Sequence, residues 1–314
     1  MVNSGYDRSD MSLYATVEEL VSSYVDYLTA VYPESLPMFK RRLNDDKEAA
    51  TAEAIVFGVL QNLHARPEVN ELPGTGGADF LCAATGGSPI FAVREPDPSS
   101  RFVVEVTSLD SASVSNRSHL PNEIVDGGGG AFDLITSAIL AKAKKKIPQL
   151  KDHPMPRVLA LVSSHAQVGA LINTYAAQEV LVSRIQWRHE IGSNGVDRNE
   201  YTDLSMSVFM KPGANGTILP ARQSISAILL IGVHGRDSVV YGILHPEAAY
   251  PFNQGFLPEV PFIRIAKWPI VDGKIWTEWV IANPPGKTIP HWRISLPRPK
   301  RKRVDPRETV SVDE

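Results

Sequence analysis

The sequence lacks most of the features that mark secreted, membrane-bound or metal-thiolate proteins. Its single cysteine, Cys82, cannot form a disulfide within the chain and belongs to no zinc or haem spacing. No apolar run approaches the roughly 18 residues that a membrane-spanning helix requires. The N-terminal segment carries acidic residues where a secretory signal carries basic ones. We therefore expect a cytoplasmic protein that makes no membrane contact.

Several common catalytic motifs are also absent. The chain contains no Gly-x-Ser-x-Gly, no Walker A loop and no His-Glu-x-x-His. The segment 74–77 superficially resembles a phosphate-binding loop, but a strand-like segment follows it, so a turn is the simpler interpretation. His234 and His245 belong to no metal-ligand spacing, and most isolated histidines are structural or surface residues. Serine hydrolase, nucleotide hydrolase and zincin activities lack support.

Positive charge is not in excess. The 32 Lys and Arg residues against 35 Asp and Glu residues give a formal net charge of -3. Such a chain does not bind nucleic acid over its whole surface by charge alone, although a local basic groove remains compatible with it. Basic residues gather at 142–151 and 298–303, where a solvated helix face and a disordered tail are the simplest interpretations.

Apolar patterning predicts a mixed α/β protein. The 314 residues, 43% of them hydrophobic, suffice for one or two domains. Helical spacing predicts helices over 16–31, 45–64, 131–150 and 167–181. Short apolar runs predict strands over 79–84, 90–94, 101–109, 157–163, 225–233 and 239–244. The region 184–219 is less regular, and a polar loop over 111–130, ending in four glycines, is long enough to be either mobile or functional.

Two acidic residues at strand-like positions carry the most information. Asp79 follows Gly-Gly-Ala, and Glu105 comes 26 residues later within Phe-Val-Val-Glu-Val-Thr-Ser. Side chains alternate along a strand, so Glu105 and Thr107 share one face of an otherwise apolar strand. An isolated glutamate in this position would ordinarily face solvent on a half-exposed sheet.

A pair of carboxylates points to a divalent cation. Two anions about 5 Å apart repel by roughly 3 kcal/mol at an effective dielectric constant of about 20, so the pair needs a cation or a shared proton. With no cysteine or histidine cluster nearby, hard oxygen ligands favour Mg²⁺ or Mn²⁺ over zinc. Such an ion can polarise a phosphate and activate a water molecule.

These residues resemble the motifs of the PD-(D/E)XK nuclease superfamily, in which a helix with a glutamate precedes an aspartate-bearing strand and a Glu-x-Lys strand. Glu53 stands on the predicted helix, Ala78-Asp79 replaces Pro-Asp, and Glu105-Val106-Thr107 replaces Glu-x-Lys. The resemblance covers residues 48 to about 165.

The resemblance implies an α/β fold with a restriction-endonuclease-like αβββαβ core over 46–183. A helical extension (1–45) would precede this core. A β-rich C-terminal α/β addition (184–297) and a basic, disordered tail (298–314) would follow it.

The implied activity is that of a magnesium-dependent hydrolase, an endonuclease that cuts nucleic acid, with DNA favoured over RNA. Asp79 and Glu105 would ligate Mg²⁺ or Mn²⁺, with the Val106 carbonyl as third ligand. Glu53 would support these ligands or hold a second ion, and Thr107 would donate a supporting hydrogen bond.

Thr107 departs from the superfamily pattern, because a hydroxyl cannot supply the cation that orients the attacking water. Some members carry this lysine on the following helix. Here Lys142, our first choice, and Lys146 lie at one margin of the apolar stripe of the 131–150 helix, whereas Lys144 points elsewhere. Both lysines could equally lay their stems on apolar surface and keep their ammonium groups in water.

Two non-enzymatic interpretations remain open at this stage. The first is a catalytically inactive module of the same fold that binds nucleic acid or a protein partner. The second is a scaffold for protein interactions with no nucleic-acid contact, which the acidic pI of about 6.3 favours.

Overall fold

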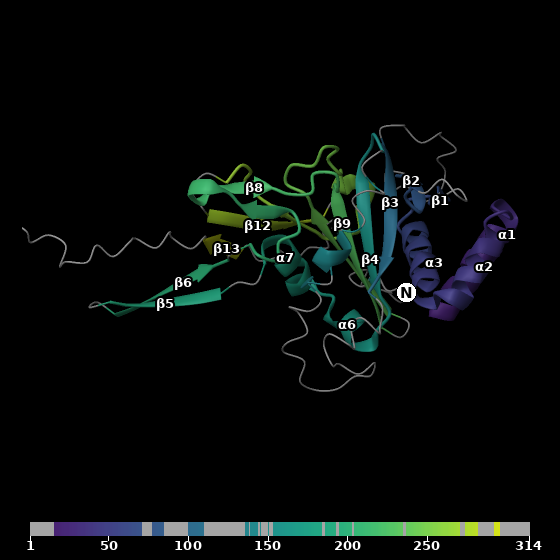
Figure 1. The fold of residues 1–314 in the computed structure, drawn as a ribbon, viewed down its shortest axis with the longest axis horizontal. Helices are drawn as coiled ribbons and strands as arrows, with labels where there is room; N and C mark the ends of the chain where they lie inside the picture. Colours follow the sequence, from purple (N-terminus) through teal and green to yellow (C-terminus); the bar gives the residue numbers. More distant parts are fainter. Residues whose placement is uncertain are drawn as a thin grey trace, which may run out of the picture.

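The computed structural model describes residues 16–70, 77–84, 100–109, part of 136–150, 153–183, 186–192, 195–202, 204–234, 237–270, 274–281 and 292–295. These residues form a mixed α/β fold built around one large sheet (Figure 1). The α/β class is therefore confirmed. The predicted strand 90–94, the loop 111–130 and the tail 298–314 lie outside the described residues.

The helices that are described along their whole length are α1 (Val17–Val31), α2 (Leu36–Asp45), α3 (Lys47–Asn62), α6 (Ala166–Leu171) and α7 (Thr174–Val182), with short 3-10 turns at Ala214–Gly216 and Gln254–Phe256. The described positions between 136 and 150 are also helical. In the part of the chain that is described, no helix combines the length and the apolar character needed to cross a membrane.

The strands are β1 (Glu68–Val69), β2 (Phe80–Ala83), β3 (Arg101–Ser108), β4 (Arg157–Ser163), β5 (Gln186–Gly192), β6 (Gly195–Tyr201), β7 (Met210–Pro212), β8 (Ile218–Pro220), β9 (Ala227–His234), β10 (Asp237–Leu244), β11 (Phe262–Ile265), β12 (Lys274–Val280) and β13 (Trp292–Ser295). The large sheet has the order β1-β2-β3-β4-β9-β10-β11-β12-β13-β6-β5, and β7 and β8 pair separately. Strand β3 is antiparallel to β2 and parallel to β4, which is in turn parallel to β9.

The N-terminal helices begin where the sequence provides caps. Thr16 and Glu19 form a capping box at the start of α1, and the Asp46 side chain accepts from the Ala49 N–H at the start of α3. Pro37 lies in the first turn of α2, where its missing N–H removes no helical hydrogen bond. The helices predicted over 16–31 and 45–64 are confirmed as α1 and α3.

The two faces of the sheet belong to different layers. Val104 and Val106 of β3 face a core shared with α1, α2 and α3. Val103 faces a second core, together with Ile139 and Ala143 of the helical 136–150 segment. All seven residues of β4 are buried, as expected for a parallel strand that is covered on both faces.

The structure differs from the sequence prediction at 167–181 and over 184–219. The single helix predicted over 167–181 is wrong, because α6 ends at Leu171 and α7 restarts after Asn173, whose side chain accepts from the N–H groups of Tyr175 and Ala176. The region 184–219, expected to be irregular, contains the β5–β6 hairpin as well as β7 and β8.

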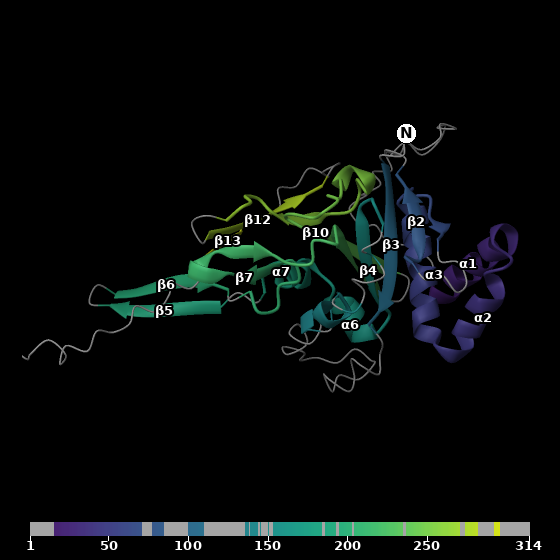
Figure 2. The ribbon, with the colours of Figure 1, turned by 45° about the horizontal axis from the view of Figure 1, so that its top comes forward.

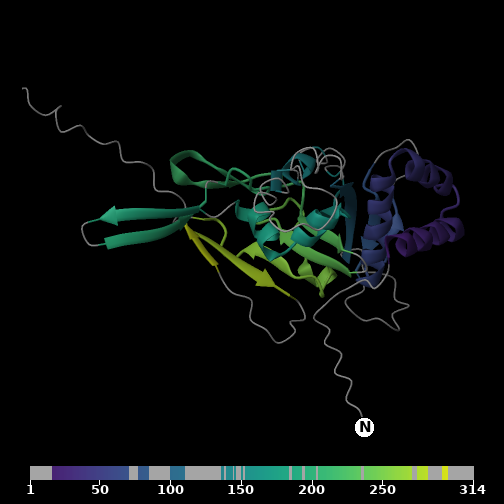
Figure 3. The ribbon, with the colours of Figure 1, turned by 90° about the horizontal axis from the view of Figure 1, so that it is seen from below.

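The β5–β6 hairpin and the N-terminal helices lie at opposite ends of the molecule (Figures 2 and 3). Strands β11, β12 and β13 connect the hairpin to the centre of the same sheet. The sequence predicted none of these three strands.

Candidate functional site

Asp79 lies at the entry to β2 and contacts the neighbouring strand directly. Its Oδ2 accepts a hydrogen bond of 2.6 Å from the backbone N–H of Val106. Because Phe80 pairs with Val104 across the ladder, Asp79 occupies the next register position, across from Glu105. The two acidic residues that the sequence singled out therefore lie on adjacent segments of the sheet.

The side chain of Glu105 belongs to the interior. The residue is 2% exposed, so the ordinary interpretation of a solvent-facing glutamate is wrong. Alternation along β3 places Glu105 and the buried Thr107 on the face of Val103, away from α3. A carboxylate is removed from water only at a substantial free-energy cost unless charge or hydrogen bonds compensate it.

The backbone of Val106 faces Asp79. The N–H and C=O groups of one strand residue point to the same side of the strand. Since the Val106 N–H reaches Asp79, its carbonyl also lies on the β2 side of β3. The predicted third ligand is thus directed toward the strand that follows Asp79.

Glu53 holds the three N-terminal helices together. Its Oε1 accepts a 2.7 Å hydrogen bond from the Tyr24 hydroxyl of α1, and its Oε2 lies 2.6 Å from Nη2 of Arg42 in α2. Glu53 and Tyr24 are buried, whereas the Arg42 side chain is 31% exposed. Glu53 therefore acts in this arrangement as an internal anchor between helices.

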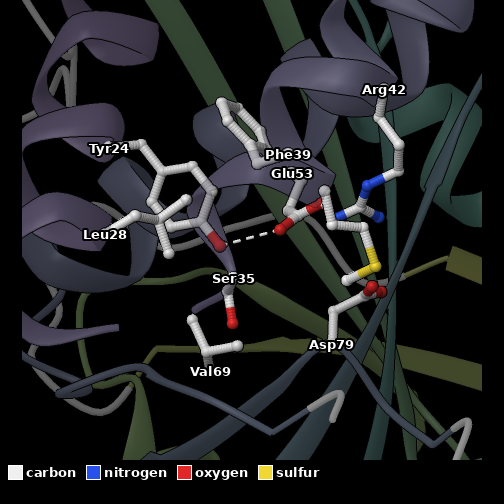
Figure 4. Close-up of a pocket in the computed structure, with 9 residues that line it drawn as sticks. Tyr24, Leu28, Ser35, Phe39, Arg42, Glu53, Val69 and Asp79 are labelled. Atoms are coloured by element: carbon white, nitrogen blue, oxygen red, sulfur yellow. Dashed lines mark hydrogen bonds and ion pairs between the residues drawn. The ribbon is translucent and has the colours of Figure 1, made fainter. Parts of the chain in front are cut away.

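Glu53 and Asp79 meet in one small pocket, with Arg42 beside them (Figure 4). The side chains that line this pocket, which we call the Asp79 pocket, come from α1, α2, α3 and the β1–β2 region: Tyr24, Leu28, Ser35, Met38, Phe39, Arg42, Glu53, Val69 and Asp79. The sequence singled out neither Tyr24 nor Arg42. Neither residue stands in a recognisable motif, so only the packing of α1 and α2 on α3 reveals them.

The charge state of this cluster follows from its burial. Burial, reinforced by the negative charge of Glu53 and the hydrogen bond to it, raises the pKa of Tyr24 well above its usual range. Asp79 raises the same pKa by its charge, and Arg42 lowers it. Tyr24 therefore remains a protonated hydrogen-bond donor to Glu53 throughout the physiological pH range.

Lys142 belongs to the helical segment on the Glu105 face. Ile139 and Ala143 of this segment are buried in the same core as Val103, as the predicted apolar stripe requires. Lys142 is half-buried and Lys145 is exposed, whereas Lys146 and Lys144 lie outside the described residues. Lys142 and Glu105 are thus on the same side of the sheet.

The oxygen ligands that the sequence predicts would suit a hard cation. Asp79 and Glu105 supply carboxylates, and Val106 supplies a carbonyl, which together fit Mg²⁺ or Mn²⁺ better than zinc. Among the described residues, no three His, Cys, Asp or Glu side chains gather in a group that could hold a metal ion. Any site here would depend on two carboxylates and the backbone.

His245 has a structural role. His245 Nε2 lies 2.8 Å from the Ala221 carbonyl, and its Nδ1 accepts from the Glu247 N–H at 2.8 Å. Burial lowers the pKa of His245 to about 4, so the ring is neutral near pH 7. The structural interpretation of His245 is confirmed. The side chain of His234 lies outside the described set.

Comparisons of this chain with known protein families, curated proteins and solved structures find no match.

Proposed function

We propose that the protein is a metal-dependent nuclease that hydrolyses phosphodiester bonds of nucleic acid, with DNA favoured. One observation carries the proposal. The carboxylate of Glu105 is buried within an apolar strand. A second carboxylate, that of Asp79, accepts a hydrogen bond from the backbone N–H of the next residue of that strand, Val106. Burying an anion in a strand opposes folding unless a charge or hydrogen bonds compensate it, and a bound divalent cation would supply such a charge.

The order of the elements supports the proposal. Helix α3 is followed by β1, β2 and β3, then by the helical 136–150 segment and β4. The four strands are neighbours in this order within the sheet. This succession agrees with the αβββαβ core that the resemblance to PD-(D/E)XK nucleases implies.

In the proposed site, the carboxylates of Asp79 and Glu105 and the Val106 carbonyl hold Mg²⁺ or Mn²⁺. When bound, the ion would polarise the scissile phosphate and lower the pKa of a coordinated water. Lys142, or Lys146 one turn later, orients the attacking water and stabilises the negative charge that develops. Thr107 supports the site by hydrogen bonding from the same face of β3. Glu53 keeps the helices in place beside Asp79.

The second candidate is a catalytically inactive module of this fold that binds nucleic acid or a protein partner. Two observations favour it. Thr107 offers no cation, and both Glu53 oxygens are engaged by Tyr24 and Arg42. On this interpretation the carboxylates are remnants of a site that no longer acts.

Calorimetry and cleavage assays on the same proteins test both candidates. Mg²⁺ and Mn²⁺ are titrated into the parent, Asp79→Asn and Glu105→Gln, with the exposed Asp26→Asn as a control of equal charge change. We expect at least about a tenfold loss of metal affinity in the two site variants only. The same proteins are then incubated with supercoiled plasmid, linear duplex and RNA.

The outcomes distinguish the nuclease from the inactive module. Metal-dependent cleavage by the parent and the control, absent in both site variants, supports the nuclease. Nucleic-acid binding without cleavage supports the inactive module. Site variants that bind metal as tightly as the parent would show that the ligands are wrongly assigned.

A further inference from the structure

The Asp79 pocket contains a cation that the sequence motifs do not account for. Arg42 is the one positively charged side chain among the described residues that line it. It comes from α2, which lies outside the αβββαβ core, and the region before residue 46 had been assigned only a role as a helical extension. The inference below rests on the proposed nuclease function and concerns how the substrate is held.

An ion pair with Glu53 fixes the position of the Arg42 guanidinium. Its Nη2 lies 2.6 Å from Glu53 Oε2, and the Glu53 side chain is only 8% exposed. The Tyr24 hydroxyl holds the other Glu53 oxygen at 2.7 Å. The Tyr24 ring is itself packed against Phe39 and Phe57, with ring centroids 4.9 Å and 4.7 Å away. The ion pair is therefore supported by a cluster of packed aromatic rings.

The same side chain also reaches the surface. The Arg42 side chain is 31% exposed, and Figure 4 shows Arg42, Glu53 and Asp79 directed into the same pocket. A guanidinium presents five N–H donors in a rigid fork that matches the oxygens of a phosphate. Because Glu53 already orients this fork, little conformational freedom is lost when a ligand binds.

Charge balance in the Asp79 pocket favours an arginine at position 42. Two carboxylates, Glu53 and Asp79, line the Asp79 pocket. Arg42 balances Glu53, so an incoming phosphate meets only the charge of Asp79, which a divalent cation would balance.

We propose that Arg42 is a substrate-binding residue of this site. Its guanidinium contacts a non-bridging oxygen of the phosphodiester positioned beside Asp79, while Glu53 and Tyr24 hold it in place. Arg42 thereby supplies positive charge to the substrate from the α3 face of the sheet. The separate role of orienting the attacking water stays with Lys142 or Lys146.

The test compares two variants that differ only at Arg42. Removing Arg42 alone would leave Glu53 as an uncompensated buried charge, so the comparison is made in a Glu53→Gln background. Binding of a short fluorescein-labelled DNA duplex is measured by anisotropy, with Ca²⁺ in place of Mg²⁺, over a series of salt concentrations. The proteins are the parent, Glu53→Gln, Arg42→Gln/Glu53→Gln and Arg41→Gln.

Arg41 provides a matched control, because it is an exposed arginine one position away on the same helix. Arg41→Gln should bind within a few-fold of the parent, and Glu53→Gln serves only as the reference against which the double variant is measured. Arg42→Gln/Glu53→Gln should lose about tenfold in affinity, and the slope of log affinity against log salt should fall by about one. Arg42→Lys, which keeps the charge and the ion pair, should lose less and serves as the measurement if the double variant does not fold.

The outcomes separate this inference from the function on which it rests. Equal affinity and salt slope in Glu53→Gln and Arg42→Gln/Glu53→Gln would make Arg42 merely an ion-pair partner, with the nuclease proposal intact. An equal loss in Arg41→Gln would reduce the effect to general surface charge and also overturn the inference. A parent that binds neither divalent metal nor DNA would overturn both proposals.

Discussion

The hydroxyl of Tyr24 donates a 2.7 Å hydrogen bond to Glu53, joining α1 to α3 inside the protein. The acceptor is a carboxylate that Arg42 pairs with on its other side. A bond to a buried charged group is stronger than one between neutral groups, and its loss leaves an anion poorly solvated. The three N-terminal helices are therefore held together by a polar lock, formed by Tyr24, Arg42 and Glu53, which lines the Asp79 pocket.

Tyr24→Phe should lower the free energy of unfolding by about 1.5–3 kcal/mol, because it removes a hydrogen bond to a buried charged group while keeping the ring. Urea unfolding of the variant and the parent measures this difference. Tyr27→Phe is the matched control, since the Tyr27 hydroxyl makes a longer, 3.3 Å bond to the neutral Pro67 carbonyl in a partly buried position. Equal effects of the two substitutions would show that the Glu53 lock has no special strength.

Glu105→Gln should abolish the stabilisation that Mg²⁺ gives the parent, because it removes a proposed ligand. The substitution preserves the shape of a side chain that is 2% exposed. Thermal unfolding without divalent metal gives the comparison, and Mg²⁺ should raise the midpoint of the parent alone. A strongly destabilised Glu105→Gln protein would indicate that the carboxylate is a structural requirement of the fold.

Lys142→Ala should lower the cleavage rate about a hundredfold or more while metal binding and folding persist, as expected for the loss of a preorganised electrostatic partner. Lys145→Ala, on the exposed side of the same helix, should change the rate little. Single-turnover cleavage of labelled DNA measures both. A loss confined to Lys146→Ala would assign the role to the residue one turn later.

His245 should make the protein less stable in acid. Burial lowers its pKa from 6.5 to about 4 in the folded state, so the unfolded chain binds a proton more readily. Stability contributed by the neutral ring is fully present above pH 6.5 and is lost as the pH falls toward 4, by up to about 3 kcal/mol.

Urea unfolding of the parent and of His245→Gln at pH 7.5 and 4.5 isolates this effect from the titration of carboxylates, which both proteins share. The parent should lose more stability than the variant between the two pH values. Identical losses would show that His245 does not control the acid response.

Local signals account for the parts of the fold that the sequence predicted. Caps and apolar periodicity identify α1 and α3, and continuous apolar runs identify β3, β4 and β9. The hairpin was missed because β5 and β6 carry many charged residues, although Gly-Ser-Asn-Gly at 192–195 has the composition of a two-residue turn. The break at Asn173 was missed because apolar spacing continues across it.

The candidate site likewise contains residues that the sequence identifies and residues that only the packing of helices reveals. The pairing of Asp79 with Glu105 was suggested by their strand-like contexts and by the resemblance to PD-(D/E)XK motifs, and the register of β2 with β3 places the two residues on adjacent segments. The lock formed by Tyr24, Arg42 and Glu53 depends on how three helices pack, which no local pattern encodes. Residues contributed by tertiary packing alone therefore had to await the structure.

The burial of β4 on both faces and between two parallel neighbours determines which pieces of the chain can be separated. Strand β9, which begins 64 residues after β4 ends, covers one edge of β4. A fragment ending near residue 183 would leave that edge unpaired in the middle of an apolar sheet, where it could pair with another chain. Such a fragment should aggregate, so functional assays need a chain that continues at least through β9 and its partner β10.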